Sequence, residues 1–339
     1  MKKNLALIFG GEGREHEISV KSAKNLYAQI DREKYDVIPI FVSKTGDWYI
    51  KTAIDGEFIS SYPVRYNGKS GFLLDSDVMQ VDGAILILHG DFGEDGRVQG
   101  ALDTAHIRYI GCGVGAGAVA SDKILTKACA DALGVKTAKW VAFTDICSPT
   151  EAKAIAEEKL SYPMIIKPSG LGSSIGISRI YTPAEFISAF LHASSAYGTR
   201  VLIEELIDVD YEVECAYLSI KSKAILSPCG RISGGGFYDF DSKYNKSEQN
   251  TATIEMPEKE IEEKITDAAR RICDFIGVHQ MARIDFLVSR DGEVYFNEIN
   301  TIPGMTDSSL YPRICESMGL RRGEFINLLI DELIDDRGI

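Results

Sequence analysis

Two strand-like segments near the C-terminus, 279–288 and 293–299, constrain the fold more than any other feature. Asp291-Gly292 lies between them, and an Asp-Gly pair between two strands is a strong signal for a two-residue hairpin turn. That turn predicts that Asp285 lies directly opposite Glu298. The hairpin also supplies apolar residues for a core, which supports the pairing of these two strands: Phe286, Val288, Val294 and Phe296.

The same register places Arg283 opposite Asn300, on the face that carries the two acids. Carboxylates at facing positions of a sheet repel each other, so the pair is destabilising unless a cation lies between them. Carboxylate and amide oxygens are ligands that Mg²⁺ takes together with nucleotide phosphates. We therefore predict a magnesium site at Asp285, Glu298 and Asn300. An ordinary solvated polar face is the alternative.

Length and composition indicate a multidomain enzyme of the cytoplasm. A chain of 339 residues forms two or three packed units, and its net charge of −13 without a basic run argues against a nucleic-acid partner. No apolar stretch approaches the roughly 20 residues that a membrane helix needs. The seven cysteines are scattered without a C-x-x-C pair, which predicts reduced thiols and neither disulfides nor a zinc site.

The order of apolar segments predicts three units. Short apolar runs at 4–9, 36–42 and 84–88 alternate with segments of helix-like sequence, which is typical of a parallel α/β layer. From Glu212 onward strands follow one another without helices, which indicates an antiparallel sheet. We expect an N-terminal α/β domain (1–121), a central α+β domain (122–211) and a C-terminal α+β domain (212–339).

A glycine- and serine-rich loop, 170–176, follows the predicted strand 164–168. Such a loop brings backbone N–H groups close to phosphate oxygens, and Lys167 at the strand end supplies a cation. The spacing fits neither a Walker A loop nor a Rossmann fingerprint. An ordinary turn is the alternative for this segment taken alone.

Two weaker segments also end strands. The turn at Pro303-Gly304 exposes amides that suit a developing oxyanion, although it could simply terminate the strand before it. The segment 89–96 holds three glycines and three acids at the carboxyl end of strand 84–88, the usual ligand position in α/β sheets. For His89 a capping or core role is the alternative to a substrate contact.

Taken together, these segments resemble the D-alanine–D-alanine ligases of the ATP-grasp superfamily. The resemblance spans nearly the whole chain and rests on ordered blocks: Gly10-Gly11, Glu15–Ser19, Leu88–Gly90, Gly93–Gly96, Gln99-Gly100, Asp122-Lys123, Lys167-Pro168, Gly172–Ser174, Phe237–Asp239, Lys243-Tyr244, Arg283–Asp285 and Asn297–Thr306. It implies a three-domain ATP-grasp fold, with two α+β domains enclosing ATP.

The resemblance also implies roles for single residues on the nucleotide side. Lys123 and Lys167 correspond to the phosphate-binding lysines, and Glu204 and Glu212 to the acids that hold adenine and ribose. The segment 206–211 between these acids lacks the glycine expected there. Further nucleotide contacts are expected at Ser173, Ser174, Glu205, Ile207, Phe296 and Asn297, and the magnesium ligands are again Asp285, Glu298 and Asn300.

On the amino-acid side, Glu15 corresponds to the residue that binds the first ammonium group. Glu15, Ser173 and Tyr244 resemble a triad that closes a lid, about 237–256, over the site, where exclusion of water protects an acyl phosphate. Lys243 is expected at the γ-phosphate. The remaining expected contacts are Arg283 and Gly304 with the oxyanion, and His89, Ser309 and Leu310 with the substrates.

The activity implied is ATP-dependent joining of two D-alanines through D-alanyl phosphate, for peptidoglycan synthesis, cell wall biogenesis and cell shape. ATP, two Mg²⁺ ions (with Mn²⁺ as a substitute) and a homodimer are expected. An apolar Leu310 leaves a serine hydroxyl unpaired, which favours D-alanine, and a D-alanine–D-serine ligase is the alternative. Lys243-Tyr244, a pair that D-lactate ligases lack, disfavours depsipeptide formation. A nucleotide-binding regulatory protein is disfavoured because every inferred catalytic residue is present.

Overall fold

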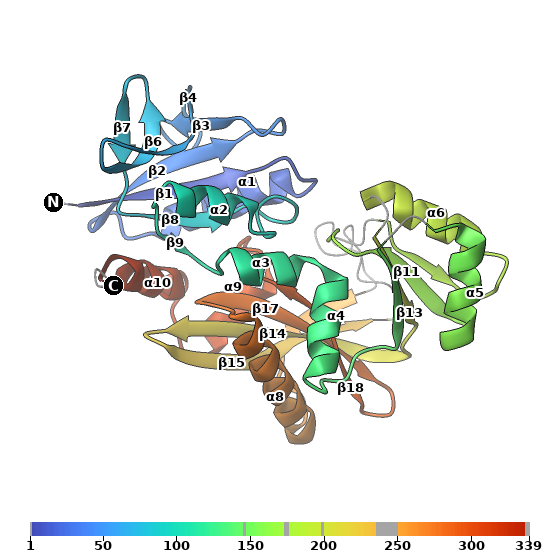
Figure 1. Cartoon of the computed structure of the whole chain (residues 1–339). Coiled ribbons are helices and arrows are strands. Elements are labelled where there is room, and N and C mark those ends of the chain that lie inside the picture. Colours follow the sequence, from blue (N-terminus) through green and yellow to red (C-terminus); the bar gives the residue numbers. More distant parts are fainter. Residues whose placement is uncertain (1, 145–146, 173–175, 198–199, 235–249, 336–339) are drawn as a thin grey trace.

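The computed structural model describes residues 2–144, 147–172, 176–197, 200–234 and 250–335 (Figure 1). Four of the predicted site residues lie outside this part of the chain, together with most of the predicted lid: Ser173, Ser174, Lys243 and Tyr244. None of the helices in the described ranges has the length and hydropathy required to cross a bilayer. All seven cysteines carry free thiols, as predicted, and five of them are buried.

The N-terminal unit is a six-stranded sheet in the order β4-β3-β2-β1-β8-β9 with a small sheet, β5-β6-β7, beside it. The parallel neighbours β2, β1, β8 and β9 confirm the predicted α/β layer. The antiparallel strands β3 to β7 were missed, because they are short and only partly apolar. The elements are β1 (Lys3–Gly10), α1 (His16–Gln29), β2 (Tyr35–Val42), β3 (Trp48–Lys51), β4 (Phe58–Ser61), β5 (Pro63–Tyr66), β6 (Lys69–Leu74), β7 (Asp77–Gln80), β8 (Gly83–Ile87), α2 (Arg97–Thr104) and β9 (Tyr109–Ile110).

The parallel strands are buried on both faces, which explains why their sequences are continuously apolar. In β1, Leu5, Leu7 and Phe9 belong to a core shared with α1 and the C-terminal helices. Ala6 and Ile8 belong to a second core on the opposite face, which includes residues of α2 and β6. The carboxyl ends of β1 and β8 therefore lie at an edge with packed elements on either side, where loops are available to build a site.

The central unit is an antiparallel sheet in the order β10-β13-β11-β12. Val201 and Ile203 of β13 pack beneath two helices, α5 and α6, on one face. Because side chains alternate, Glu204 and its neighbour-strand residue Lys167 project from the other face. The elements are α3 (Val114–Ser121), α4 (Lys123–Ala132), β10 (Trp140–Phe143), α5 (Pro149–Lys159), β11 (Met164–Pro168), β12 (Ser178–Ile180), α6 (Phe186–Tyr197) and β13 (Val201–Glu205).

The C-terminal unit is a five-stranded sheet in the order β16-β15-β14-β17-β18, and its neighbouring strands are all antiparallel, as predicted. Helix α8 covers one face of this sheet through residues such as Ile265 and Ile272. The elements are β14 (Val209–Ile220), β15 (Lys223–Gly234), β16 (Asn250–Ile254), α8 (Lys259–Ile276), β17 (Met281–Ser289), β18 (Val294–Asn300), α9 (Leu310–Ser317) and α10 (Glu324–Asp335).

Helices connect the units across the predicted boundaries. Buried residues of α9 and α10 share one core with β1, α1 and the face of the C-terminal sheet that lies opposite α8. Helices α3 and α4 contact β18 and α8 (Figure 1). The division at residues 121 and 211 stays a prediction. In packing terms, the N-terminal and C-terminal units form one continuous body around the loops that follow β8 and β18.

The C-terminal hairpin has the predicted pairing at its acidic end but not at its turn. Ser289 and Glu293 close a three-residue loop, in which Gly292 has φ +79°, instead of the two-residue turn expected at Asp291-Gly292. The strands therefore leave the turn one residue out of the predicted register. A β-bulge at Asn297 then shifts β18 by one residue. Asp285 consequently lies opposite Glu298, and Arg283 opposite Asn300, as predicted.

The docking of α9 gives a test of this packing. Tyr311 is 1% exposed, its hydroxyl donates to the Tyr217 carbonyl at 2.8 Å, and its ring contacts Phe325 edge-on. Tyr311→Phe keeps the ring and loses the hydrogen bond, so the free energy of unfolding should fall by about 1–2 kcal/mol. Tyr311→Ala should cost about 3–5 kcal/mol because it leaves a cavity. Guanidinium denaturation measures both, and equal losses in the two variants would contradict this packing.

Candidate active site

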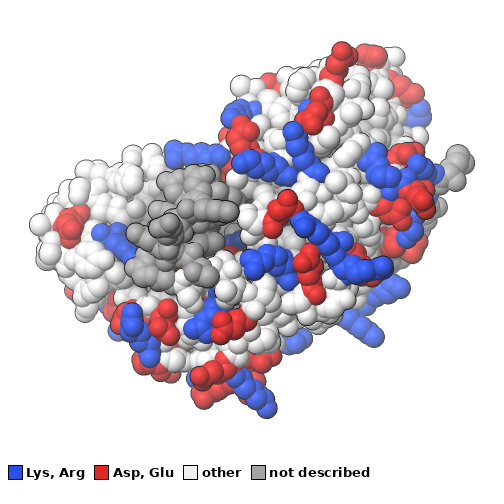
Figure 2. Space-filling view, turned by 180° about the vertical axis from the view of Figure 1, so that it is seen from behind, with Lys and Arg blue, Asp and Glu red and all other residues white. Residues whose placement is uncertain are grey.

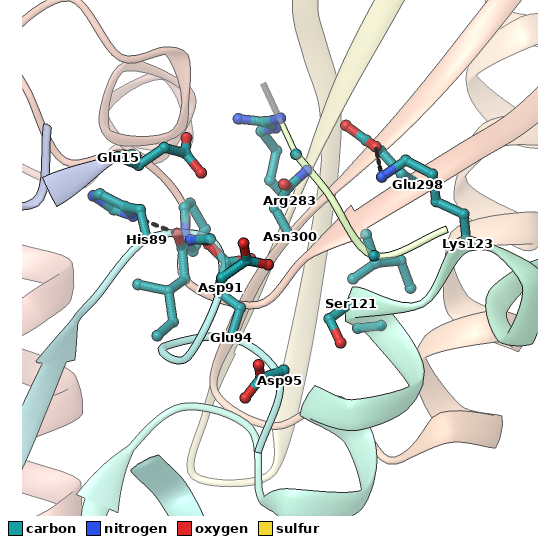
Figure 3. A pocket seen from close by; sticks show the side chains of 18 residues that line it. Glu15, His89, Asp91, Glu94, Asp95, Ser121, Lys123, Arg283, Glu298 and Asn300 are labelled. Atoms are coloured by element: carbon teal, nitrogen blue, oxygen red, sulfur yellow. Dashed lines mark hydrogen bonds and ion pairs between the residues drawn. The ribbon is translucent and has the colours of Figure 1, made fainter. Parts of the chain in front are cut away.

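One pocket lies where the three units meet, between the loops after β8 and β18 and the start of α4 (Figure 3). It encloses about 850 Å³, including its open mouth. Seven residues predicted from the sequence line it: Glu15, His89, Lys123, Arg283, Glu298, Asn300 and Gly304. Figure 3 shows Glu15, His89 and Glu94 on one side, the Lys123–Glu298 pair on the other, and Arg283 and Asn300 between them.

The lining is strongly acidic. Five acids, Glu15, Asp91, Glu94, Asp95 and Glu298, face two cations, Lys123 and Arg283. Burial and the nearby Glu15 raise the pKa of Glu94 to about 8, although the Gly90 N–H donates to its Oε1 at 3.0 Å. Burial also raises the pKa of Asp91. A pocket with this charge favours ligands that carry ammonium groups or divalent cations.

A row of three carboxylates crosses the C-terminal sheet at the pocket. Glu214 of β14 pairs with Asp285 of β17, which pairs with Glu298 of β18. Arg283 donates to both oxygens of Asp285, at 2.8 and 2.6 Å, and its Nε lies 3.5 Å from Oε1 of Glu214. Burial opposes the charge on Arg283, but Asp285 and Glu214 hold its pKa well above the usual value. The guanidinium is thus fixed in one orientation beside the pocket.

Lys123 offsets the negative charge of Glu298, the acid at the other end of this row. Its Nζ donates to the Leu171 carbonyl at 2.8 Å and lies 3.3 Å from Oε2 of Glu298. The side chain is buried at the start of α4, which Asp122 caps by accepting from the backbone N–H of Ile124. Lys123 therefore ties the loop after β11 to the metal-binding strand that the sequence predicted.

The donor chemistry of Asp285, Glu298 and Asn300 suits magnesium, since all three offer oxygen on one face of a hairpin. Among the described residues, however, no three acid, histidine or cysteine side chains converge closely enough to hold a metal ion. Arg283 occupies the oxygens of Asp285, to which the Asn300 amide also donates at 3.2 Å. The residues therefore fit a cation, provided that Arg283 exchanges its contact with Asp285 when the cation binds.

Glu15 reaches the glycine loop from the N-terminal unit. It precedes the first residue of α1, and its Oε2 lies so close to Gly90 and Gly172 that a Cβ built at these glycines would be 2.5 and 3.6 Å away. Gly172 directly precedes Ser173, the predicted partner of Glu15, which lies outside the described residues. Glu15 is thus next to the segment that the predicted triad requires, and the triad itself stays a prediction.

The residues predicted for the oxyanion and the second substrate lie in the turn after β18 and at the start of α9. Gly304 lines the pocket, and a Cβ built there would lie 2.8 Å from Oγ of Ser309. The hydroxyl of Ser309 accepts from the Thr306 N–H at 3.1 Å, which fixes this turn at the start of α9. Leu310 is 5% exposed and packs into the core behind the turn.

A second charged cluster lies on the open face of the central sheet. Glu204 is buried between Lys167, whose Nζ is 2.5 Å from Oε2, and Lys127 of α4, which forms an ion pair with Oε1. Burial opposes the charge on Glu204, but the two lysines lower its pKa below the usual value. Burial and the neighbouring Lys167 lower the pKa of Lys127. The cluster carries one surplus positive charge, which suits an anionic ligand.

The structure also describes five other predicted nucleotide contacts, each with its own surroundings. Glu205 pairs with Lys139 at 3.4 Å, and Ile207, Glu212 and Asn297 are partly buried. Phe296 is 1% exposed, with its ring packed against Phe286 in the core. The segment between Glu204 and Glu212, which lacks the glycine expected from the family, contains a β-bulge at Asp210. The pairing of β14 with β17 shifts by one residue there.

Comparison with known proteins now identifies the family. Residues 4–112 match the D-ala D-ala ligase N-terminus, and residues 129–334 match the D-ala D-ala ligase C-terminus. The chain belongs to the D-ala D-ala ligase family. Curated relatives include D-alanine--D-alanine ligases of Chlorobium limicola (35% identical, covering 98% of this chain and 96% of that protein) and Chlorobium phaeovibrioides (37% identical, covering 96% and 95%).

Solved structures of the family share the fold. The VanG D-Ala:D-Ser ligase from Enterococcus faecalis superposes with a TM-score of 0.86 at 31% identity, covering 98% of this chain and all of that one. D-alanyl-alanine synthetase A from Vibrio cholerae gives 0.85 at 27% identity, covering 98% and 99%. The predicted ATP-grasp architecture is thereby confirmed.

Three charged residues of this ligase-family site were missed in the sequence. Lys127 lies four residues after Lys123, a spacing that places both lysines on one side of α4. Glu214 lies two residues after Glu212 on the same strand, where alternation puts both on one face. Glu94 lies in the acidic segment 89–96, for which a ligand position was predicted, but no role was predicted for Glu94 itself. The spacing in the sequence could have indicated Lys127 and Glu214, whereas the burial of Glu94 depends on the fold.

The outer surface offers no competing site for a polyanion on the face shown in Figure 2. Basic and acidic side chains of the described residues are interspersed there, and they do not form one extended basic area. This distribution agrees with the net charge of −13. The concentrated charge of this ligase-family chain is therefore inside the pocket and not on that surface.

The raised pKa of Glu94 predicts a pH dependence of stability. Between the ordinary glutamate pKa, 4.5, and about 8, the folded state binds a proton that the unfolded state has released. The free energy of unfolding should therefore fall as the pH rises through this range. Glu94→Gln should remove this part of the decline, as measured by urea denaturation at pH 5 and 8. An unchanged decline in the variant would contradict protonation of Glu94 in the folded state.

Proposed function

We propose that this chain joins two D-alanines at the expense of ATP, through a D-alanyl phosphate. The observation that carries this proposal is the composition of a single pocket. Glu15, Arg283 and Gly304 line it together with Glu298, whose partner strand presents Asp285 at the facing position. A carboxylate for an ammonium group, donors for an oxyanion and oxygen ligands for a cation are thus collected at one place.

In the first step, the carboxylate of the first D-alanine attacks the γ-phosphate of ATP, the bond between the γ-phosphorus and the bridging oxygen breaks, and ADP leaves as D-alanyl phosphate forms. Glu15 holds the ammonium group of that substrate, and Lys123 and Lys167 neutralise phosphate charge. Lys243 is proposed at the γ-phosphate, and Ser173, Ser174, Glu204, Glu205, Ile207, Glu212, Phe296 and Asn297 form the rest of the nucleotide site. Magnesium bound to Asp285, Glu298 and Asn300 would supply charge neutralisation at the phosphates.

In the second step, the amine of the second D-alanine loses its proton and attacks the acyl phosphate. Arg283 and the Gly304 amide stabilise the oxyanion of the tetrahedral intermediate, and phosphate then leaves. The orientation of Arg283 by Asp285 and Glu214 supports this role, because a fixed donor costs little reorganisation during the reaction. Closure of the predicted lid, with Glu15, Ser173 and Tyr244, keeps water from the acyl phosphate.

The cellular setting follows from the family. The dipeptide is proposed to supply peptidoglycan synthesis, and with it cell wall biogenesis and cell shape. The enzyme is proposed to act in the cytoplasm as a homodimer, with two Mg²⁺ ions for which Mn²⁺ can substitute.

A D-alanine–D-serine ligase is the second candidate. The likeness to the VanG D-Ala:D-Ser ligase, with a TM-score of 0.86 and 31% identity, favours it. Against it stands Leu310, an apolar residue that the sequence predicts beside the second substrate together with Ser309, although its side chain packs into the core behind the turn. A serine hydroxyl beside an apolar side chain would lack a hydrogen-bond partner.

Phosphate release from ATP separates these candidates. The assay uses D-alanine alone, D-alanine with D-serine, D-alanine with D-lactate, and the L-enantiomers, with each product identified by mass. D-alanine alone should give phosphate and D-alanyl-D-alanine in a ratio of one to one. Product only from D-alanine with D-serine would overturn the choice of second substrate. Absence of phosphate release with every pair would overturn the ligase proposal.

A further inference from the structure

A buried serine of α1 connects three parts of the molecule. Ser22 is fully buried, and its Oγ lies 3.0 Å from Nε2 of His89, at the end of β8, and 3.3 Å from the backbone N of Met305, in the turn after β18. The other ring nitrogen of His89, Nδ1, lies 3.0 Å from the carbonyl oxygen of Ile302. Ser22 and His89 therefore hold both ends of the turn Ile302–Met305.

The chemistry of these contacts fixes their direction. A carbonyl oxygen only accepts, so Nδ1 of His89 carries the proton that Ile302 receives. In the neutral ring Nε2 is then an acceptor, and the Ser22 hydroxyl donates to it. The Ser22 oxygen accepts in turn from the Met305 N–H. Burial lowers the pKa of His89, which keeps the ring in the neutral form that this arrangement uses.

The turn held in this way forms one wall of the pocket. Ile302, Pro303 and Gly304 all line it, and Met305 is fully buried behind them. Asn25, one helical turn after Ser22, donates to the Met305 carbonyl at 2.6 Å. Since α1 begins directly after Glu15, the helix that follows the proposed ammonium ligand also grips the turn that contains Gly304.

We propose that Ser22 is a positioning residue, which acts through His89 and Met305 to hold the Gly304 amide in register with Glu15. The inference rests on the proposed function, because it concerns attack on the acyl phosphate. Ser22 touches neither substrate. It aligns the oxyanion donor on the C-terminal unit with the ammonium site on the N-terminal unit, and both bonds through its hydroxyl are lost together in Ser22→Ala.

The readout is the ratio of phosphate released to dipeptide formed. In Ser22→Ala the turn loosens, so the amine attacks the acyl phosphate more slowly. Water that reaches the acyl carbon instead releases D-alanine and phosphate, and phosphate then exceeds dipeptide. We expect kcat for dipeptide to fall about tenfold or more, with the phosphate ratio rising to about two or more. KM for ATP should stay unchanged, because Ser22 does not contact the nucleotide residues.

The chain supplies a matched control in Ser19. It lies on the same helix and is equally buried, and its hydroxyl accepts from Gly10 N–H and donates to the Ile87 carbonyl, away from the turn. Ser19→Ala should lower thermal stability to a similar extent and leave the ratio at one. Ser22→Thr, which keeps a hydroxyl, should restore most of the coupling. Asn25→Ala, which removes the bond to Met305 and the bond that the Gln29 amide donates to Asn25, concerns a less buried residue and should raise the ratio in the same direction.

The possible results separate this inference from the proposed function. If the wild-type chain forms no dipeptide, the proposed function fails. If the wild type forms dipeptide but Ser22→Ala and Asn25→Ala both keep a ratio of one, the positioning role is wrong. A rise in the ratio in Ser19→Ala equal to that in Ser22→Ala would also overturn it, because loss of any buried hydroxyl on α1 would then suffice. Asn25→Ala keeps the test decisive if Ser22→Ala does not fold.

Discussion

The repulsion between Asp285 and Glu298 is the constraint on which the rest of the site depends. The two acids lie at facing positions of a hairpin, and Glu214 extends the row on the next strand. Such an arrangement is unfavourable unless cations lie close by. Arg283 and Lys123 provide them, one from within the row and one from the start of α4. The protein thus maintains a concentrated negative charge, balanced by internal cations, at the strand that is proposed to bind the metal.

The same two cations connect the site to the fold. Lys123 also bonds the loop after β11, and Arg283 lies beside Glu214 at the pocket, so the charge balance depends on the relative placement of the central and C-terminal units. The continuous core formed by α1, α9, α10 and both neighbouring sheets holds the N-terminal unit against the C-terminal unit. Ser22 and His89 contact the turn at 302–305, so buried hydrogen bonds also hold the backbone of this pocket wall. Helix α1 begins beside the carboxylate that is proposed to bind the ammonium group, and it also contacts the turn that carries the proposed oxyanion donor.

Much of this site could be predicted from the sequence, because the chemistry lies in short segments with a known period. The facing pair Asp285–Glu298 follows from strand alternation and an Asp-Gly signal, although the route was partly fortuitous: a three-residue loop and a bulge at Asn297 each shift the register by one. Bulges leave little trace in one sequence, since they depend on packing against the neighbouring strand. The roles of Glu94 and Ser22 depend on burial and on partners distant in the chain, which no local pattern encodes. The antiparallel strands between β2 and β8 were missed because they are half-exposed and their sequences resemble those of loops.

The facing carboxylates are tested most directly by the binding of Mn²⁺, a paramagnetic substitute for Mg²⁺, in the presence of ATP, measured by electron paramagnetic resonance. Asp285→Asn and Glu298→Gln should each weaken Mn²⁺ binding by about tenfold or more. Glu214→Gln, which removes the third acid of the same row and is not a proposed ligand, should bind Mn²⁺ like the wild type. Equal affinity in all four proteins, or a loss confined to Glu214→Gln, would contradict a metal site at this hairpin.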